Sequence, residues 1–571
     1  MRTYEQDAKT LGPRWPFTGR VDELELLRGA LTASRRGIVV TGPAGRGKTR
    51  LITEAVRGTD HARVNGTPEA RHLPLAAFAH LLPGPGSLHG AVRALSGVRL
   101  LVVDDAQLLD EDSAALVHQL AAHGRTRLIV AAADEAPVPG AVSRLWTGEL
   151  LPRLALAPLP EEDTAALLGA AGFEALTVRR LHRLCRGDLR LLRSLAAALA
   201  AGDALVAVPG TGERAWRGPL PLTPAVRDRL APLLARSVPG ERETLERLAF
   251  AEPVRLPLYG LDLDVLEGLE AAGLIAVDDA GRAGLADPLH GPALRAATGR
   301  LRARRLSRDP AGLDAALDAE QRRLTGRLAR MDVRPVVTPV GDWLVAEGEP
   351  VPAGYAAVRA RFARLQGAVR DAAAWAREGL RWTPGDSECD TELTLAEAEL
   401  DGSGPRGRTE GDVYARYRAV RVGEAASALP PGSVLARHAE ALARGEGDAL
   451  DRAAAALEER GFLLFAAEAH AQAVRAHRDP RSGRRSRTRA LALARRCQGA
   501  RTPALAGLVF GELTARQRQI VALAAAGLSN REIAERLTLS VRTVGNHLYG
   551  AYTRLGTGDR EALPCLLDRS A

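Results

Sequence analysis

The feature that most constrains the fold of this 571-residue chain is a glycine-rich turn near its amino terminus. Residues 38–41 (IVVT) are an apolar run, and Gly42-x-x-x-x-Gly47-Lys48-Thr49 follows at once. In this pattern, the P-loop, backbone N–H groups and the start of the next helix bind phosphate groups. A buried strand that enters a helix through such a turn predicts one unit of a parallel α/β sheet.

The P-loop residues have distinct predicted roles in holding a nucleotide. Lys48 would reach the β- and γ-phosphates of ATP, and the Thr49 hydroxyl would be a ligand of Mg²⁺. Lysine is informative at this position because Lys9 is the only other lysine of the chain. A fortuitous glycine turn is the alternative. The candidate site for ATP with Mg²⁺ comprises Gly42, Pro43, Ala44, Gly45, Arg46, Gly47, Lys48 and Thr49.

Two adjacent carboxylates complete the predicted nucleotide site. Residues 100–103 are an apolar run that ends at Asp104-Asp105. We expect Asp104 to hold Mg²⁺ together with Thr49, and Asp105 to orient or activate the attacking water. Two acids alone would equally fit a solvated turn, but the upstream P-loop favours the metal site. Residues 127–133 (RLIVAAA) indicate a further buried strand, and strands that alternate with helices predict a parallel α/β sheet.

The far end of the chain predicts a helix-turn-helix. Apolar residues recur at helical spacing in residues 533–537 and again at Val544 and Leu548. Ser540 can cap the second helix by accepting a hydrogen bond from a backbone N–H near Thr543. An ordinary surface hairpin of helices is the alternative. In the DNA-binding interpretation, the outward-facing contacts of the second helix are Arg542, Thr543, Asn546, His547 and Tyr549.

Residues 513–556 resemble the four-helix DNA-binding domain of LuxR-type transcriptional regulators. The resemblance rests on residues 513–514 (LT), 527–534 (GLSNREIA), 543–544 (TV) and 554–556 (RLG). It implies double-stranded promoter DNA with paired half-sites as the partner, together with RNA polymerase. The matched stretches add further candidate DNA-binding residues, which are Ser529, Asn530, Arg531, Val544 and Arg554.

Two positions depart from the LuxR pattern. Gln517 stands where the family usually has glutamate, and Gly545 stands where a longer side chain is usual in the recognition helix. Glycine costs about 1 kcal/mol in a helix interior and offers no base contact. We therefore expect base contacts to come from Asn546, His547 and Tyr549.

The amino-terminal part looks like the nucleotide-binding domain of the large ATP-binding LuxR regulators, which belong to the signal-transduction ATPases with numerous domains. The resemblance is carried by FTGR from residue 17, the P-loop, residues 63–83 and residues 104–116. Three positions that sense the nucleotide in that class depart from its pattern. The class often has arginine at the end of the strand that here reads Ala131-Ala132-Ala133-Asp134, and often has Gly-x-Pro where this chain has Gly187-Asp188-Leu189. It commonly has histidine at the position of Asp287. The resemblance implies ATP binding and at most slow, switch-type hydrolysis.

Composition divides the rest of the chain. A Gly/Pro-rich boundary lies at residues 209–221, and residues 305–500 are helical in pattern and rich in Ala, Arg and Leu. The fold class we predict is an α/β P-loop NTPase followed by all-α winged-helix-like and helical-repeat segments and a C-terminal four-helix helix-turn-helix domain. An irregular helical scaffold is the alternative to helical repeats. The predicted parts are a flexible tail (1–11), the P-loop ATP-binding domain (12–205), the winged-helix-like segment (206–304), a tetratricopeptide-like sensor or scaffold region (305–500) and the DNA-binding domain (501–571).

Charge and cysteine content indicate which binding partners and which cellular compartment to expect. The net charge of +9 favours polyanions, and residues 475–501 hold ten arginines against one acid, although a solvated face would explain this run equally well. The four cysteines lack metal-ligand spacing, which predicts unpaired thiols. There is no apolar run of membrane-spanning length and no secretion signal at the start, so we expect a cytoplasmic protein without a membrane partner.

These features favour a transcriptional regulator, most readily an activator, that uses ATP as a switch. In this hypothesis the nucleotide, and an effector or protein bound to the helical region, promote self-association and control the helix-turn-helix. One alternative is an NTP-dependent protein scaffold with a degraded DNA-binding domain, and another is an ATP-hydrolysing enzyme. None of the twelve histidines falls into a recognisable nucleophile or metal arrangement, so a metabolic enzyme is not expected.

Overall fold

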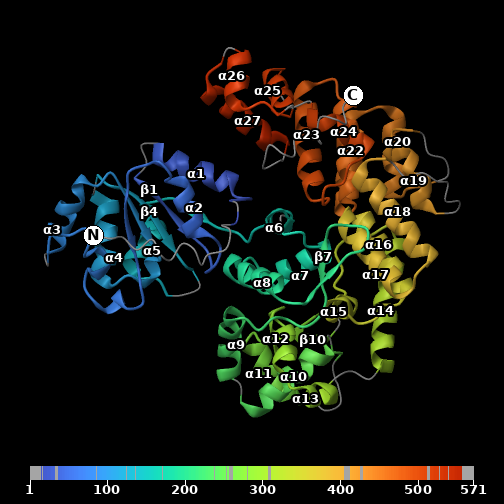
Figure 1. The fold of residues 1–571 in the computed structure, drawn as a ribbon, viewed down its shortest axis with the longest axis horizontal. Coiled ribbons are helices and arrows are strands. Elements are labelled where there is room, and N and C mark those ends of the chain that lie inside the picture. Colours follow the sequence, from blue (N-terminus) through green and yellow to red (C-terminus); the bar gives the residue numbers. More distant parts are fainter. Residues whose placement is uncertain are drawn as a thin grey trace. The chain divides into compact units, whose positions relative to one another are not determined.

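The computed structural model describes most of the chain as two compact units (Figure 1). One unit comprises residues 1–308 with 346–348, and the other comprises residues 309–345 with 349–571. The residues that the structure does not describe are 1–14, 16, 33–35, 85–86, 124, 135–136, 170, 237, 253, 256–260, 279–280, 307–309, 404–411, 425–428, 511–514, 526, 538 and 556–571.

A five-stranded parallel sheet forms the centre of the first unit, with the strand order β2-β3-β4-β1-β5. The parallel α/β sheet predicted from the P-loop and the apolar runs is therefore confirmed. Both β1 and β3 are buried along their whole length. The bounds of the strands are β1 (Gly37–Thr41), β2 (Ala62–Asn65), β3 (Leu100–Asp104), β4 (Arg127–Ala132) and β5 (Arg153–Ala155).

Helices cover both faces of this sheet because successive strand residues point to opposite sides. Ile38 and Val40 of β1 pack in one cluster with α1 (Val21–Thr32) and α2 (Lys48–Ala55). Val39 of the same strand packs in a second cluster with the helices of the other face. Those helices are α3 (Leu88–Ala94), α4 (Glu111–His123) and α5 (Gly140–Thr147).

The rest of the first unit is built around one hydrophobic core that extends from Leu168 of α6 to Leu294 of α12. This part of the unit begins with α6 (Glu161–Gly169), α7 (Ala175–Cys185), α8 (Leu189–Ala201) and the antiparallel pair β6 (Leu205–Ala207) and β7 (Arg214–Trp216). It continues with α9 (Pro224–Arg236), α10 (Pro239–Ala251), β8 (Val254–Arg255), α11 (Leu263–Ala271), β9 (Ile275–Val277), β10 (Arg282–Leu285), α12 (His290–Ala297) and α13 (Arg300–Leu306).

The segment expected to be winged-helix-like is not all-helical. Strands β8, β10 and β9 form a small antiparallel sheet beside helices α10, α11 and α12. These strands are two to four residues long, which is too short for alternation to be visible in the sequence. Between β9 and β10, the Gly281 amide donates to the Asp278 carbonyl oxygen at 2.8 Å, and Gly281 has a φ of +68°.

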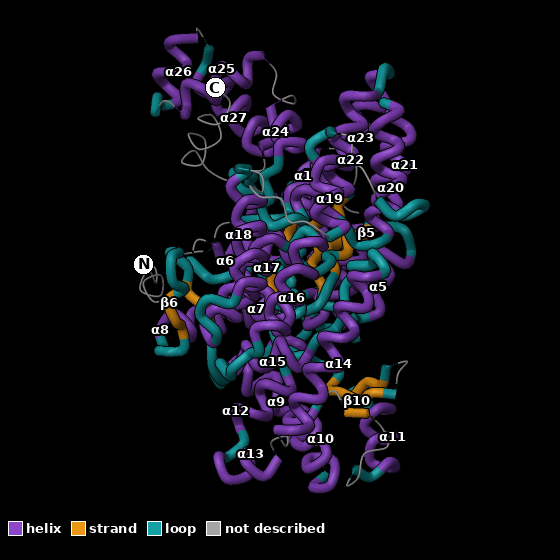
Figure 2. Tube along the Cα trace, turned by 90° about the vertical axis from the view of Figure 1, so that its right-hand side faces the viewer, coloured by secondary structure: helices purple, strands orange, loops and turns teal. Residues whose placement is uncertain are grey.

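The second unit is helical in its described part, and the views in Figures 1 and 2 show the helices packed side by side. Consecutive helices pack as hairpins, for example α16 with α17 and α21 with α22. The helices that precede the DNA-binding domain are α14 (Pro310–Ala329), α15 (Pro339–Glu347), α16 (Ala353–Gln366), α17 (Val369–Trp382), α18 (Ser387–Asp401), α19 (Val413–Arg421), α20 (Val434–Arg444), α21 (Gly447–Glu459), α22 (Leu463–Ala476), α23 (Pro480–Arg495) and α24 (Pro503–Phe510).

Three described helices end the chain, namely α25 (Ala515–Ala525), α26 (Asn530–Leu537) and α27 (Val541–Leu555). They enclose a small separate core, in which Ile533, Val544 and Leu548 meet Ile520 and Val521. This arrangement agrees with the helical spacing of the sequence. Within the described part of the chain, no helix is long and apolar enough to cross a membrane.

Candidate functional site

The P-loop lies between β1 and α2, as the sequence predicts. Gly45 and Gly47 have φ values of +80° and +87°, in the left-handed region that favours glycine. A Cβ atom on Gly45 would lie only 2.1 Å from Asp188 Oδ1. The loop therefore needs glycine at this position, and its turn leads directly into the amino terminus of α2, where free backbone N–H groups favour an anion.

Lys48 is buried at the first turn of α2 and points back to its own loop. Its Nζ atom donates to the carbonyl oxygens of Gly42, at 2.6 Å, and Pro43, at 2.9 Å. Burial lowers the pKa of Lys48, whereas the nearby carboxylates of Asp105, Asp134 and Asp104 raise it. The ammonium group thus lies between the phosphate-binding loop and the acidic ends of β3 and β4.

Asp134 is a member of this site that the sequence analysis treated only as a departure from a family pattern. It follows β4, and its Oδ2 atom lies 3.6 Å from Nη2 of Arg153 on β5. Arg153 also donates from Nε to Thr41 Oγ1 at 2.8 Å, at the point where β1 enters the P-loop. A cation therefore stands beside the P-loop, although it comes from β5 and not from the end of β4.

Asp104, the predicted Mg²⁺ ligand, ends β3 and is almost fully buried. Its Oδ2 atom accepts a hydrogen bond from Arg63 Nη2 at 2.6 Å, and its Oδ1 atom accepts one from the Asp105 amide at 3.1 Å. Arg63 lies on β2 and also donates to Thr53 Oγ1 at 3.2 Å. The sequence did not single out Arg63, because its proximity to Asp104 depends on the pairing of β2 with β3.

Asp105 has a left-handed backbone, with a φ of +49°, and its side chain is exposed. Its Oδ1 atom accepts a hydrogen bond from Gln107 Nε2 at 3.0 Å, and Gln107 Oε1 accepts one from the amide of Ala133 at 2.8 Å. Gln107 thereby joins the ends of β3 and β4 and orients the Asp105 carboxylate toward solvent. This arrangement can position a water molecule, and Gln107 is a second residue that the sequence analysis missed.

The remaining P-loop residues lie at the mouth of the site or against the following helices. Ala44 and Thr49 are exposed. Arg46 donates from Nη1 to the carbonyl oxygen of Arg186, which follows α7. The amide of Leu189, at the start of α8, donates to the carbonyl oxygen of Gly45 at 3.0 Å. The helices that follow the sheet are therefore hydrogen-bonded to the phosphate-binding loop itself.

The second of these contacts gives a physical account of one departure from the family pattern. Proline at residue 189 would lack the N–H group that donates to Gly45. The neighbouring Asp188 caps α8 through the amides of Arg190 and Leu191, and it forms an ion pair with Arg229 of α9 at 2.6 Å. Where the family has a turn made rigid by proline, Gly187-Asp188-Leu189 forms a turn held by the Leu189 amide and the Asp188 side chain.

Asp287, the third departure, accepts a hydrogen bond at Oδ1 from the Leu289 amide at 2.9 Å and so stabilises its own turn. His290, at the start of α12, is the histidine of this segment. Burial lowers the pKa of His290, Asp287 raises it, and the guanidinium groups of Arg229 and Arg186 lower it further. Its Nδ1 atom is buried and has no hydrogen-bond partner among the described residues. Its proximity to Asp287 is the signal by which the sequence could have indicated it.

The helix-turn-helix begins each of its last two helices with a side-chain cap. Ser529 Oγ accepts a hydrogen bond from the Glu532 amide at 3.3 Å, and Glu532 Oε2 accepts one from the Ser529 amide at 2.7 Å. This reciprocal pair is a capping box. Ser540 Oγ accepts a hydrogen bond from the Thr543 amide at 3.0 Å, which confirms the predicted cap. The turn between the helices is therefore sharply defined.

The outward face of α27 carries most of the predicted DNA contacts. Arg542, Asn546 and Tyr549 are exposed, whereas Thr543 and His547 are half-buried. On α26 and its cap, Ser529 and Arg531 are exposed and Asn530 is half-buried. Arg531 forms an ion pair with Glu535 at 3.2 Å. The Arg554 side chain lies outside the described residues, as do Leu513, Thr514 and Gly556.

Val544 is not a DNA contact. Its side chain is fully buried in the core of the three helices, because the helical period that exposes Arg542 and Asn546 turns residue 544 inward. Gly545 adjoins it on α27, and a Cβ atom built there would meet no heavy atom within 4 Å. A side chain would therefore fit at residue 545, where glycine leaves α27 without one.

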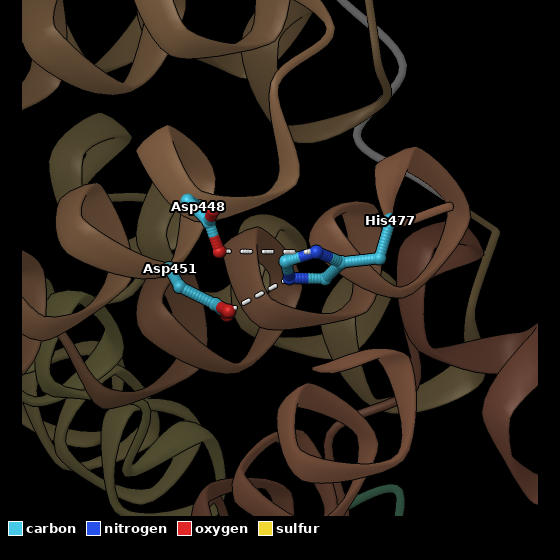
Figure 3. A group of neighbouring side chains, drawn as sticks. All are labelled: Asp448, Asp451 and His477. Atoms are coloured by element: carbon cyan, nitrogen blue, oxygen red, sulfur yellow. Dashed lines mark hydrogen bonds and ion pairs between the residues drawn. The ribbon is translucent and has the colours of Figure 1, made fainter. Parts of the chain in front are cut away.

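One group of acidic and histidine side chains lies outside these two sites (Figure 3). Asp451 accepts hydrogen bonds from His470 Nδ1 at 2.7 Å, His477 Nε2 at 2.9 Å and Ser486 Oγ at 2.8 Å. Burial would raise the pKa of Asp451, but these three donors hold it at about 2. Asp448 Oδ1 lies 4.0 Å from His477 Nδ1. With three donors already on Asp451, the group fits a structural link between α21, α22 and α23 better than a metal centre.

The cysteines whose positions are described agree with the prediction of unpaired thiols. Cys185, Cys389 and Cys497 are free and buried, and burial raises the pKa of each thiol to about 12. Such thiols are poor nucleophiles and poor metal ligands near neutral pH. Cys565 lies outside the described residues.

Comparison with known proteins identifies the carboxyl-terminal domain. Residues 511–567 match the family model of the bacterial regulatory proteins of the luxR family. Proteins of Mycobacterium bovis and Mycobacterium tuberculosis that are named HTH-type transcriptional regulators are 43% identical to this chain over 74 residues. The aligned segment is 13% of this chain and only 8% of each relative's length. The chain therefore ends in a LuxR-type helix-turn-helix domain.

Solved structures similar to this chain include two archaeal ATPases. A Walker-type ATPase of Pyrococcus abyssi aligns with 48% of this chain and 95% of its own length, at 13% identity and a TM-score of 0.30. A signal-transduction ATPase with numerous domains and a tetratricopeptide repeat sensor, from Pyrococcus horikoshii, aligns with 95% of this chain and 78% of its own length, at 14% identity and a TM-score of 0.24.

Proposed function

We propose that this protein is an ATP-binding transcriptional regulator whose nucleotide state controls DNA binding by its LuxR-type domain. The observation that carries the proposal is the presence, in one chain, of a glycine-rich P-loop beside buried Lys48 and Asp104, and of a capped helix-turn-helix. A regulator needs both an input and an output, and these two sites supply them.

The residues at the end of the sheet fit a magnesium nucleotide. Gly45 and Gly47 have left-handed backbones that glycine adopts readily, and this turn would let the loop amides face a phosphate group. Thr49 and Asp104 supply the oxygen ligands that Mg²⁺ prefers, and Lys48 supplies a cation for the β- and γ-phosphates. When ATP binds, Lys48 would exchange its two loop carbonyl partners for phosphate oxygens, and Asp104 would exchange Arg63 for the hydrated metal ion.

Hydrolysis, where it occurs, would be slow and would serve as a switch. Asp105 is exposed and is oriented by Gln107, so it is the residue of this site best placed to orient an attacking water. The contacts of Arg46 with the Arg186 carbonyl and of Leu189 with Gly45 connect the phosphate-binding loop to the helices after the sheet. A change of nucleotide would therefore reach α7 and α8 through the loop backbone.

The output would be read by α27 in the major groove. Arg542, Asn546 and Tyr549 are exposed along this helix, with His547 beside them. Two copies of the domain would contact half-sites about one helical turn apart, which requires self-association of the chain. As an activator, the protein would then contact RNA polymerase at the promoter.

The helical region holds a cavity of about 320 Å³ that we propose as the effector site. Arg364 in its wall donates to Glu392 at 2.8 Å, and Arg361 pairs with Asp412. Burial, together with the nearby Arg364 and Arg421, lowers the pKa of Arg418 in the same wall. Apolar side chains such as Phe465 complete the lining. A small effector with both charged and apolar parts suits this surface.

Selection of bound sites from random duplex DNA by the full-length protein, with and without ATP and Mg²⁺, tests this function. Enrichment of a two-fold symmetric sequence that depends on ATP supports a nucleotide-controlled regulator. Failure to retain any DNA at low salt would favour the second candidate function, a nucleotide-dependent protein scaffold. That candidate is favoured by Gly545, which removes a side chain from the reading face of α27.

A further inference from the structure

Helix α23 has an exposed face made almost entirely of arginine. Residues 475–501 contain ten arginines and a single acid, Asp479. Asp479 accepts hydrogen bonds from the amides of Arg481 and Ser482 and so caps the amino terminus of α23. The acid therefore lies at one end of the helix, and the arginines farther along it have no acidic neighbour in their own segment.

The arginines share one side of the helix. Ser486, Ala490 and Leu493 are buried and mark the side that packs against the rest of the helical unit. At about 100° per residue, positions 484 and 495 point away from the buried side, and positions 481, 485 and 489 form a row along its flank, with a spacing of about 6 Å per step. The α23 arginine face consists of the exposed residues Arg481, Arg484, Arg485, Arg489, Arg495 and Arg496.

This concentration of charge is unfavourable for the free protein. Like charges four residues apart destabilise a helix by about 0.2–0.5 kcal/mol per pair. Arg496 lies 3.8 Å from Glu458, but both side chains are about half exposed and such a pair contributes little. A polyanion would remove the repulsion, and guanidinium groups are suited to phosphate because they can donate two parallel hydrogen bonds.

The DNA-binding domain follows in sequence a helix that packs against α23. Helix α24 packs against α22 and α23, and Leu505 and Leu508 are buried in the same core as Leu493. Arg475 also donates from Nη2 to the carbonyl oxygen of Ala504 at 3.2 Å. Since α24 ends at Phe510 and the LuxR-type domain begins at residue 511, DNA held by α27 would be tethered close to the α23 arginine face.

We propose that the α23 arginine face is a second, sequence-independent DNA contact that binds backbone phosphates beside the half-site read by α27. The inference rests on the proposed function, because it adds affinity to a DNA complex that α27 must form. Phosphate contacts position a protein on DNA without reading its sequence. The α23 arginine face would therefore contribute to affinity and to salt dependence, whereas base discrimination would remain with α27.

The test compares two full-length triple variants of equal charge. One is Arg481→Gln/Arg485→Gln/Arg489→Gln on α23, and the matched control replaces three exposed arginines on α19, α20 and α21, which are Arg416→Gln/Arg437→Gln/Arg452→Gln. Glutamine has nearly the helix propensity of arginine, so both variants should fold, which circular dichroism verifies. Affinities are measured over a range of salt concentrations for random-sequence duplex DNA and for a site selected by the wild-type protein.

Each phosphate contact adds about 0.9 to the slope of log affinity against log salt. We expect the α23 variant to lose about 2 to 3 units of slope on both DNAs, and to keep the wild-type ratio of specific to random affinity. The control should keep the wild-type slope. Equal slopes for the two variants would overturn the inference, and so would a fall in the specificity ratio of the α23 variant alone.

Two further outcomes separate this inference from the function on which it rests. Wild-type protein that binds DNA with a slope unaffected by the α23 substitutions removes the α23 arginine face from the DNA interface and leaves the proposed function intact. Wild-type protein that binds no DNA at low salt removes both. An α23 variant that loses affinity for duplex RNA but keeps its affinity for DNA would assign the face to RNA and contradict the proposal.

Discussion

Arg63 Nη2 lies 2.6 Å from Oδ2 of Asp104, so a cation from β2 forms an ion pair with the carboxylate that we propose as a Mg²⁺ ligand. Asp104 is nearly fully buried, and a carboxylate without its partner there would be costly. The ion pair therefore satisfies the Asp104 carboxylate, and under the proposed function Mg²⁺ would compete with Arg63 for it. Competition between the two cations would set the metal dependence of nucleotide binding.

Arg63→Gln should lower the Mg²⁺ concentration needed for ATP binding. If the Arg63–Asp104 ion pair contributes about 1 kcal/mol, its removal should lower the required Mg²⁺ concentration about fivefold. The free variant should also be less stable, with stability restored by ATP and Mg²⁺. Nucleotide binding by calorimetry across a Mg²⁺ titration measures the effect, and Arg57→Gln, which removes an exposed pair with Glu54, is the control. A higher Mg²⁺ requirement would show instead that Arg63 supports the bound nucleotide.

Leu189→Pro should loosen the helices after the sheet from the P-loop. Residue 189 is the first residue of α8, a position where proline is tolerated, so the principal loss is the amide that donates to the Gly45 carbonyl. We expect a loss of about 1 kcal/mol in stability and weaker ATP binding. Leu189→Ala keeps the amide and serves as the control. Equal melting temperatures and ATP affinities for the two variants would count against a role for this hydrogen bond.

Val544→Ala should lower stability and Asn546→Ala should lower base discrimination, although the two residues are only two positions apart. Val544 is fully buried, and its truncation should cost about 2 kcal/mol of stability in the DNA-binding domain. Asn546 is exposed, so its truncation should leave stability within about 0.5 kcal/mol and reduce base discrimination. Hydrogen exchange of α27 measures the first effect and competition with random DNA the second. A stable Val544→Ala variant with altered specificity would contradict this assignment.

The low pKa of the Asp451 carboxyl group predicts that the folded chain loses stability in acid. Its pKa in the folded chain is about 2, below the ordinary value of 3.8, because His470, His477 and Ser486 donate to it. Its contribution to stability is therefore fully present above about pH 4 and is lost as the pH falls through the folded pKa. Asp451→Asn should flatten the acid limb of the unfolding profile between about pH 4 and 2. The exposed Asp448→Asn is the control, and an equal change in both variants would exclude a special role for Asp451.

The two ends of the chain could be predicted because each is encoded by residues close together in the sequence. Gly47 and Lys48 determine a phosphate-binding turn, and Ser540 with Thr543 determines the start of a helix. Contacts between residues that strand order or helix packing brings together could not be predicted from the sequence. Arg63 lies 41 residues from Asp104, and the pairing of β2 with β3 brings them together.

The errors of prediction have a similar physical origin. Strands β8, β9 and β10 are held by their pairing with one another and not by any pattern long enough to recognise. Val544 was included among DNA contacts because a family motif contains it, whereas the helical period had already placed it in the core. Gln107 contacts Ala133 after β4, and His290 lies near Arg186 and Arg229, so these neighbours became visible only with the fold.

The central claim is that ATP at Lys48 controls the DNA affinity of the LuxR-type domain. Its most direct test is the affinity of full-length protein for a selected DNA site, with and without ATP and Mg²⁺, for the wild type and for Lys48→Ala. We expect ATP to tighten binding by the wild type by about tenfold or more, which corresponds to about 1.4 kcal/mol of coupling, and to leave Lys48→Ala unchanged. Equal affinities for the wild-type protein with and without ATP would contradict the account.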